Sequence, residues 1–297
     1  MAALCAGVAV LAGIASALGV FARGDGTFEM VINERGVPYE MATTGVYAYN
    51  AQRVVAEGIG WDIFTLFIAV PALVAAAVLV GRGSFRGRLF AAGMLGYFFY
   101  QYLEYAVTWA FGPLFLLFVV IYAAGLAGIV WIGVSIAREG VAGRFGERFP
   151  RRSLAVLNTA MAALLTLLWV QRIAAALGGD LLVGGLTSET TMTVQALDLG
   201  LMVPTSVFIA VLAWRRSAAG YVLASAYSVT FVAMALAIVG MLLSAWAVEG
   251  VLEAPPVAIF GLAALAAVAI GLRMYRSVVP ALLSSPPTAA RTTPVAA

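Results

Sequence analysis

Eight apolar segments, each of about 20 residues or more, follow one another along this chain. They cover residues 2–22, 63–81, 89–110, 113–136, 154–177, 196–214, 220–248 and 256–274. A helix needs about 20 apolar residues to cross roughly 30 Å of hydrocarbon. Since 63% of the residues are hydrophobic and 10% are charged, the sequence predicts an all-α, polytopic integral membrane helix bundle with about eight transmembrane helices.

Several kinds of functional site need side chains that this sequence lacks. It contains no histidine, no lysine and one cysteine, Cys5, inside the first apolar segment. His-ligated haem, His/Cys zinc sites, CxxC redox pairs, Schiff-base lysines and His-based catalytic triads are therefore excluded. We expect no cofactor, no metal site and no catalytic residue. The positive charge is all arginine, which with the many alanines and glycines is typical of a GC-rich genome, so the pI near 9.2 indicates no nucleic-acid partner.

The arginines predict the orientation of the chain. Thirteen of the 17 fall in the loops after the second, fourth and sixth segments or at the C-terminal end of the chain, from Arg273 onwards, and short cytoplasmic loops collect positive charge. We predict a multi-pass protein of the cell membrane with cytoplasmic N- and C-termini. The first segment has an alternative interpretation as a signal peptide cleaved near Ala17. No basic residue precedes it and its apolar stretch continues to Ala22, which favours a retained helix.

Part of the second segment recurs in the sixth, 133 residues later. Residues 71–91 and 204–224 are identical at nine of 21 positions, including Pro71 with Pro204 and Arg82 with Arg215. Both copies run in the same direction across the membrane. The match predicts a parallel repeat of four helices plus four, with the halves at residues 1–136 and 154–276. The alternative is chance similarity between two Ala/Val-rich membrane segments.

The repeat places two prolines at matching positions. Pro71 and Pro204 lie in mid-helix, where each should kink its helix and free a backbone carbonyl, because proline lacks an N–H donor. Asp62 and Asp198 lie near the outer starts of the same two helices. We interpret both aspartates as N-caps that accept hydrogen bonds from free amides.

The third segment carries a polar stripe. Gly93, Tyr97, Gln101, Glu104 and Thr108 follow one another at spacings of 4, 4, 3 and 4, which puts them on one narrow face of a helix. Glu104 lies below the outer boundary of the membrane, where an isolated charge is unfavourable. It therefore needs a partner, water or a proton, and we expect it to face the interior of the bundle.

Arg172 in the fifth segment is the second ionisable residue placed within the hydrocarbon. It shares a helix face with Asn158. Its depth allows an ion pair with Glu104 in the outer half of the membrane. In the alternative interpretation, which its bulky apolar neighbours favour, Arg172 extends its long side chain to the outer interface.

Two segments lie outside the predicted helices. The outer loop 23–62 has aromatic and acidic residues, and Tyr47 and Tyr49 are spaced as on one face of a short strand. It is either a small ordered cap or a flexible connector. The tail 282–297 is rich in Ser, Thr and Pro, which predicts a disordered cytoplasmic tail. The transmembrane bundle is expected to span residues 1–281.

Two functions from different classes fit these features. The first is a transporter-like carrier of a small solute, an ion or protons, with a polar site around Glu104. The second is a non-catalytic membrane sensor, scaffold or accessory subunit that binds a protein partner through the outer loop, with Glu104 as a structural anchor. A membrane-embedded enzyme with Glu104 and Asp62 or Asp198 as acid and base comes third, because no nucleophile or metal set supports it. The expected partner in every case is the lipid bilayer.

Overall fold

The chain folds into the predicted all-α membrane helix bundle. The computed structural model describes residues 1–141 and 143–279 and is 75% helical. Within these residues, seven helices are long and apolar enough to span a membrane. They are α1 (Ala2–Phe21), α2 (Gln52–Phe64) with η1 (Thr65–Ala69) and α3 (Val70–Gly81), α5 (Phe115–Glu139), α6 (Arg151–Leu177), α8 (Thr193–Leu197) with η2 (Asp198–Met202) and α9 (Val203–Trp214), α10 (Ala218–Glu249) and α11 (Ala254–Ser277). The predicted disordered tail lies outside the described residues.

Helix α4 (Phe85–Thr108) corresponds to the remaining predicted span and differs from the other seven. Four tyrosines, a glutamine and a glutamate make it more polar, and it is not among the helices that are apolar enough to span by composition. Its 24 residues give it a length of about 36 Å. Because 15 of those residues are buried, α4 is shielded from lipid by its neighbours.

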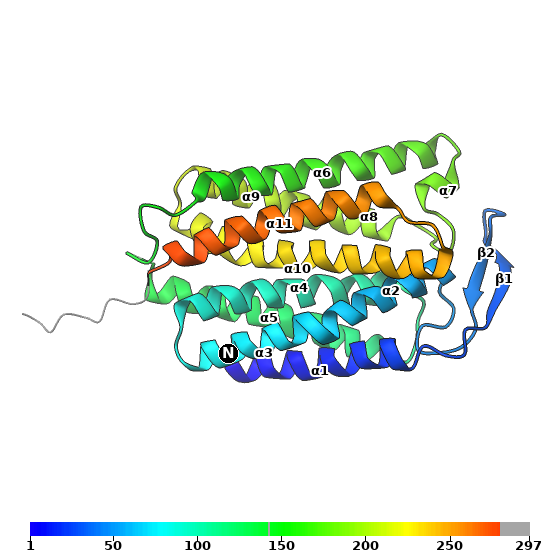
Figure 1. Cartoon of the computed structure of the whole chain (residues 1–297), viewed down its shortest axis with the longest axis horizontal. Helices are drawn as coiled ribbons and strands as arrows, with labels where there is room; N and C mark the ends of the chain where they lie inside the picture. The colour runs from blue at the N-terminus through cyan, green and yellow to red at the C-terminus, as the bar shows by residue number, and fades with distance from the viewer. Residues whose placement is uncertain (142, 280–297) are drawn as a thin grey trace, which may run out of the picture.

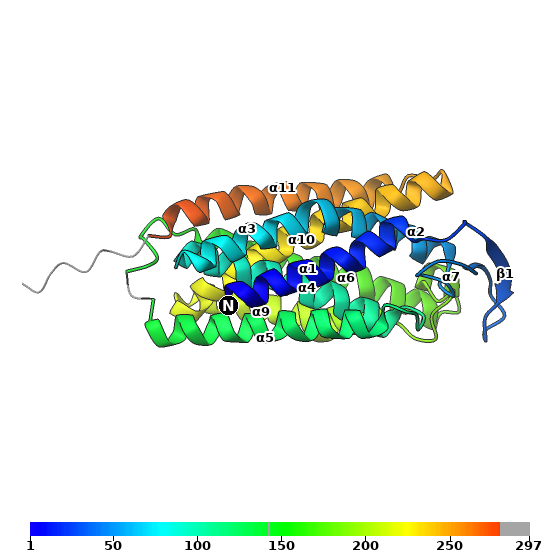
Figure 2. The same ribbon diagram turned by 90° about the horizontal axis from the view of Figure 1, so that it is seen from below.

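The long helices lie nearly parallel (Figure 1, Figure 2), and they form two groups, one above the other in Figure 1. One group contains α1, α3, α4 and α5, and the other contains α6, α9, α10 and α11. Helix α10 packs on both α2 and α4 and so joins the groups. The centre of the larger hydrophobic core lies along α4.

Helix bounds recur at the predicted offset of 133 residues. The π-helical turns η1 and η2, the helices α3 and α9, and the first residues of α4 and α10 are all separated by this number. The turn from α3 to α4 and the turn from α9 to α10 are also alike. Gly87 and Gly220 lie so close to Leu79 and Leu212 of the preceding helices that a Cβ would clash there. The elements around the matched sequence therefore repeat in structure, while a duplication of all four helices stays a prediction.

Each of the two matched prolines follows a π-helical turn. Pro71 and Pro204 are the second residues of α3 and α9. The N–H of Val70 donates to the carbonyl of Thr65, and that of Val203 to Asp198, five residues earlier in both cases. The helix therefore widens before each proline. This π-helical turn takes the place of the simple kink that the sequence predicts. Such turns are frequent at functional sites.

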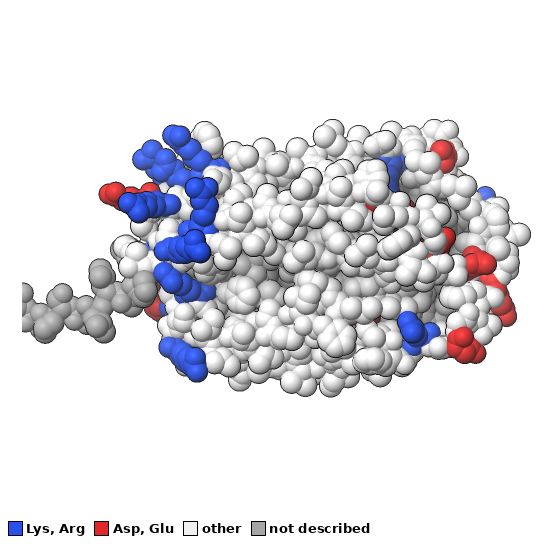
Figure 3. All heavy atoms as spheres, in the orientation of Figure 1, with Lys and Arg blue, Asp and Glu red and all other residues white. Residues whose placement is uncertain are grey.

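The two ends of the bundle carry opposite charge (Figure 3). We call one the arginine end, defined by Arg82, Arg138, Arg215 and Arg276, which lie at the ends of α3, α5, α9 and α11. Both Met1 and Val279 lie there (Figure 1). Arg88, which the sequence assigns to a loop, is instead buried in the first turn of α4, where it donates two 2.6 Å hydrogen bonds to Glu139.

The opposite end, the hairpin end, carries a small antiparallel sheet. Strands β1 (Phe28–Ile32) and β2 (Pro38–Ala42) pair from Phe28 with Ala42 to Ile32 with Pro38. The strand suggested by Tyr47 and Tyr49 is wrong, since both lie in turns after β2. The loop is also shorter than the predicted 23–62, because α2 begins at Gln52. An Arg53 with Glu57 pair at 2.9 Å supports this early start, and Arg53 also binds Glu249 and Glu253 beside α10 and α11.

Candidate functional site

The predicted polar stripe of α4 divides between two neighbouring helices. Tyr97 and Gln101 face η1, whereas Glu104 lies nearer to η2 and its Asp198. Thr108 has a buried hydroxyl with no hydrogen-bond partner among the described residues. Helix α4 therefore contributes to two polar clusters, one on each side.

The first cluster, here the η1 cluster, consists of Trp61, Thr65, Tyr97 and Gln101. The indole N–H of Trp61 donates to the Tyr97 hydroxyl at 2.9 Å, and the hydroxyls of Tyr97 and Thr65 are 2.7 Å apart. The Gln101 amide donates to Thr65 at 2.9 Å. All four side chains are buried. Because their polar groups satisfy one another, this cluster holds α2 against α4.

Asp62 lies between Trp61 and Thr65 of the η1 cluster along the chain, and its predicted role as an N-cap is wrong. It is in the last turn of α2, which begins ten residues earlier, because the helix continues beyond the apolar stretch. Its carboxyl group is fully buried and accepts a short hydrogen bond from Tyr47, in the turn after β2. Its Oδ1 has no partner in the described part of the chain. Gly19 leaves room for this pair, since a Cβ there would overlap both side chains.

The second cluster, here the η2 cluster, consists of Tyr100, Glu104, Trp169 and Asp198. Asp198 is not an N-cap either, since the helix begins at Thr193. Its carboxyl group accepts a short hydrogen bond from the Tyr100 hydroxyl and one of 2.7 Å from the Trp169 indole. Asp198 is the repeat mate of Thr65, so the first residue of each π-helical turn bonds a tyrosine of α4.

Glu104 completes the η2 cluster without a cationic partner. It is 7% exposed and takes part in no hydrogen bond or ion pair within residues 1–141 and 143–279. The charged groups that act on it are the carboxylates of Asp198, Glu57 and Glu189. A charged carboxylate without a partner is unfavourable within the membrane.

Arg172 and Asn158 lie apart from Glu104. The Arg172 guanidinium is 5.5 Å from the centre of the Trp169 ring, and no ion pair joins it to Glu104 in the described chain. The ion pair that its depth allows is therefore absent among the described residues. Asn158 is buried and donates at 2.8 Å to the carbonyl of Leu154 in its own helix, while its Oδ1 has no described partner. On α6, Trp169 is the residue that reaches the site, through its hydrogen bond to Asp198.

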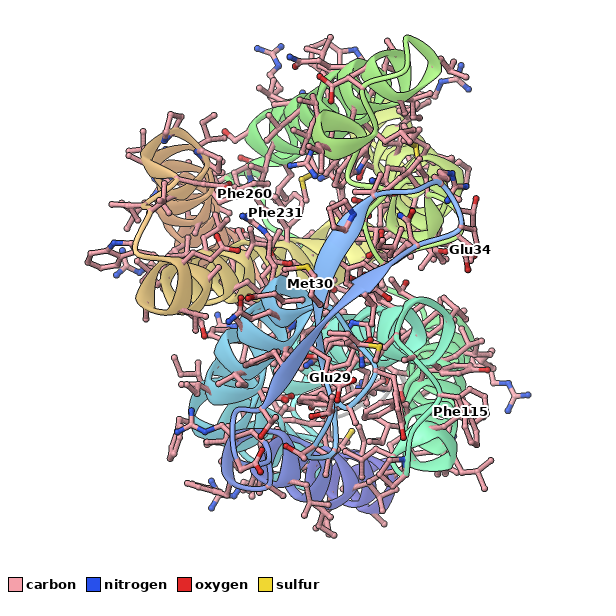
Figure 4. The ribbon with its side chains drawn as sticks, turned by 90° about the vertical axis from the view of Figure 1, so that its right-hand side faces the viewer. Glu29, Met30, Glu34, Phe115, Phe231 and Phe260 are labelled. Carbon is pink, nitrogen blue, oxygen red and sulfur yellow. The ribbon has the colours of Figure 1, made fainter. Side chains whose placement is uncertain are left out.

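The hairpin crosses the end of the bundle near this site (Figure 4). Its turn, marked by Glu34, reaches the loop between α7 (Leu181–Gly184) and α8. The Asn33 amide donates to the carbonyls of Leu186 and Thr187, at 3.3 and 2.6 Å. Arg35 donates to the carbonyls of Glu189 and Thr190, at 3.4 and 2.7 Å. The outer loop of the first half is thereby fastened to the second half.

Ionisation of Glu189 should loosen this contact. Burial raises the pKa of Glu189 to about 7, repulsion from Glu57 adds to the rise, and Arg172 opposes it. Because the folded state favours the protonated acid, its stabilisation is full below the ordinary value of 4.5 and is lost as the pH rises through about 7. We expect faster amide exchange in residues 28–42 at pH 8 than at pH 5.5, after correction for intrinsic rates. Glu189→Gln should remove most of this difference, and an unchanged difference would contradict the assignment.

Sequence reasoning missed several residues of the two clusters. Tyr100 lies four residues before Glu104 and so shares its face, a signal that the spacing contains. Thr65 could be found as the repeat mate of Asp198. Glu57 and Glu189 lie outside the two clusters but act on Glu104. Neither helical spacing nor the repeat offset relates them to Glu104.

The site contains no recognisable metal centre. No group of three or more His, Cys, Asp or Glu residues within the described ranges is arranged to hold a metal ion. Comparison with known proteins adds no assignment, since no family model, no curated protein and no solved structure matches the chain.

Proposed function

We propose that the protein is a proton-linked carrier of a small solute or ion, with Glu104 and Asp198 as its proton-binding pair. The observation that carries this proposal is that Glu104 is buried without a cationic partner among the described residues, on the same face of α4 as Tyr100, which binds Asp198. Two nearby carboxyl groups in a medium of low polarity share a proton more readily than they both ionise. Acidic residues inside membrane segments commonly belong to proton relays.

Polar groups continue from Asp198 towards the arginine end. Asp198, Met202 and Ser206 lie at spacings of four residues and so follow one face of η2 and α9. The Tyr227 hydroxyl is 3.0 Å from the Ser206 hydroxyl and donates to the Met202 carbonyl at 3.3 Å. These buried groups extend about 12 Å along the helix. They support a path for protons from the η2 cluster into the second half.

The carrier is proposed to lie in the cell membrane with the arginine end in the cytoplasm. The gathering of most arginines at this end supports the orientation. The η2 cluster then lies in the outer half of the membrane, beneath the hairpin. Two π-helical turns at matching places support a moving part, because such turns interrupt the regular helix.

The proposal is tested by proton uptake into liposomes that contain the purified protein. A potassium diffusion potential drives uptake, and a trapped pH-sensitive dye reports it. We expect Glu104→Gln and Asp198→Asn to lower uptake at least tenfold, because each removes one member of the pair. Glu34→Gln, an exposed acid on the hairpin turn, is the matched control. Normal uptake in Glu104→Gln, with flux present in the unmodified protein, would contradict the proposal.

A second candidate is the sensor, scaffold or accessory subunit that binds a protein through the outer loop. The observation that favours it is the exposure of Met30 and Ile32 on β1, at 66% and 71%. In the described chain β1 pairs with β2 alone, so its other edge is open to a further strand. Under this function, Met30→Glu abolishes co-purification of a defined partner from the native membrane, and Glu104→Gln does not. Retention of the partner by Met30→Glu would argue against it.

A further inference from the structure

A groove of about 450 Å³ lies between α6 and α9, in the half nearer to the arginine end. Its walls are mainly alanine and valine, including Ala160, Ala163 and Val211. The one hydroxyl of the lining belongs to Thr159 and is already bonded to the Ala155 carbonyl at 3.0 Å. The groove therefore offers no free hydrogen-bonding group along its length, which suits a hydrocarbon chain better than water or a polar solute.

The groove ends at charged and aromatic residues. Trp214 and Arg215 form its limit at the arginine end, where tryptophan is typical of the membrane interface. Arg152 lies three residues before the lining residue Ala155, and Thr159 follows Ala155 by four. Arg152 therefore belongs to the same face of α6. Neither Arg152 nor Arg215 takes part in an ion pair in the part of the chain that the structure describes. Both guanidinium groups are thus free to bind an anion.

The matching place in the first half is built from different residues. Arg82 is the repeat mate of Arg215, and Gly81 is the mate of Trp214. There α1 packs along α3, and a Cβ on Gly81 would be in contact with Ala2, at 3.8 Å. The two halves therefore present the same turn and arginine, but in the second half an apolar groove leads up to them.

We propose that this groove binds an acyl chain of an anionic phospholipid, whose phosphate is held by Arg215 and Arg152. The guanidinium fork matches the geometry of a phosphate oxygen pair. Attraction by one basic residue corresponds to about a fivefold preference for an anionic lipid over a lipid without net charge. A second copy of this chain is the competing occupant, since small residues also allow helices to pack closely.

Native mass spectrometry of the purified full chain tests the proposal. The probes are phosphatidylglycerol and phosphatidylcholine with identical acyl chains, and the quantity is the ratio of their dissociation constants for the first bound lipid. We expect phosphatidylglycerol to bind at least fivefold more tightly, and Arg215→Gln to remove about fivefold of that preference. Arg82→Gln is the matched control and should leave the ratio unchanged.

A second variant distinguishes the contribution of the apolar groove to lipid binding from that of the arginine charge. Ala163 is exposed in the groove, so Ala163→Leu fills it without disturbing the core and should weaken both lipids. Ala266→Leu, at an exposed position of α11, is its control. Equal effects of Arg82→Gln and Arg215→Gln would overturn the proposal in favour of a diffuse basic surface. Unchanged lipid binding in Ala163→Leu, with a dimer converted to a monomer, would overturn it in favour of a second copy.

Discussion

Gly93→Val should destabilise the bundle by about 1–3 kcal/mol or more, measured as the free energy of unfolding in detergent by denaturant titration. A Cβ on Gly93 would lie 2.3 Å from the carbonyl oxygen of Ala226 and 2.6 Å from the Cβ of Val229, on α10. The Gly93 carbonyl also accepts a hydrogen bond of 2.8 Å from Thr230. The backbone of α10 would have to move, and the contact between the two helix groups would open.

Gly133→Val provides the matched control on α5. A Cβ there meets nothing within 4 Å, and the change in helix propensity is the same. We expect this variant to stay within about 0.5 kcal/mol of the unmodified protein. Equal losses in the two variants would mean that helix propensity, and not the approach of α4 to α10, sets the effect.

Tyr47→Phe should lower the free energy of unfolding by about 1–3 kcal/mol, because it leaves the buried Asp62 carboxyl group without its donor. Tyr47 is 2% exposed and Asp62 is fully buried, with Oδ1 already unpartnered in the described chain. The same change frees the turn after β2 from α2. Amide exchange in residues 43–51 should therefore rise together with the loss of stability.

Tyr49→Phe tests whether the effect belongs to this hydrogen bond. Tyr49 lies in the same turn but is 62% exposed, so its hydroxyl remains in water. We expect no change in stability beyond about 0.5 kcal/mol. A loss in Tyr49→Phe equal to that in Tyr47→Phe would show that the turn responds to any substitution.

Much of the bundle could be predicted because its signals are local. Hydrophobic length predicts the long helices, and the offset of 133 residues predicts where η1 and η2, then α3 and α9, occur in matching positions. Helix starts were harder to predict. Asp62 and Asp198 resemble N-caps at the edge of the apolar stretches, but α2 continues outward to Gln52, where Arg53 binds acids on two other helices.

The candidate site could be predicted only in part, because spacing along one helix is a local signal and contacts between helices are not. Helical spacing places Tyr97, Gln101 and Glu104 on one side of α4, yet it cannot show which neighbour each will meet. The division between η1 and η2 depends on how the two halves pack. Depth along the helix allowed an ion pair between Glu104 and Arg172, but depth does not define the rotation of one helix relative to another, and the pair does not form in the described chain.

The polar character of α4 also affects how the protein is made. A segment with four tyrosines, Gln101 and Glu104 enters lipid less readily than its apolar neighbours when the translocon presents it alone. The adjoining α3 and α5 are strongly apolar, and both pack against α4 in the finished bundle. We therefore expect α4 to enter the membrane together with α3 or α5. Insertion of α4 then depends on contact with one of these two apolar helices.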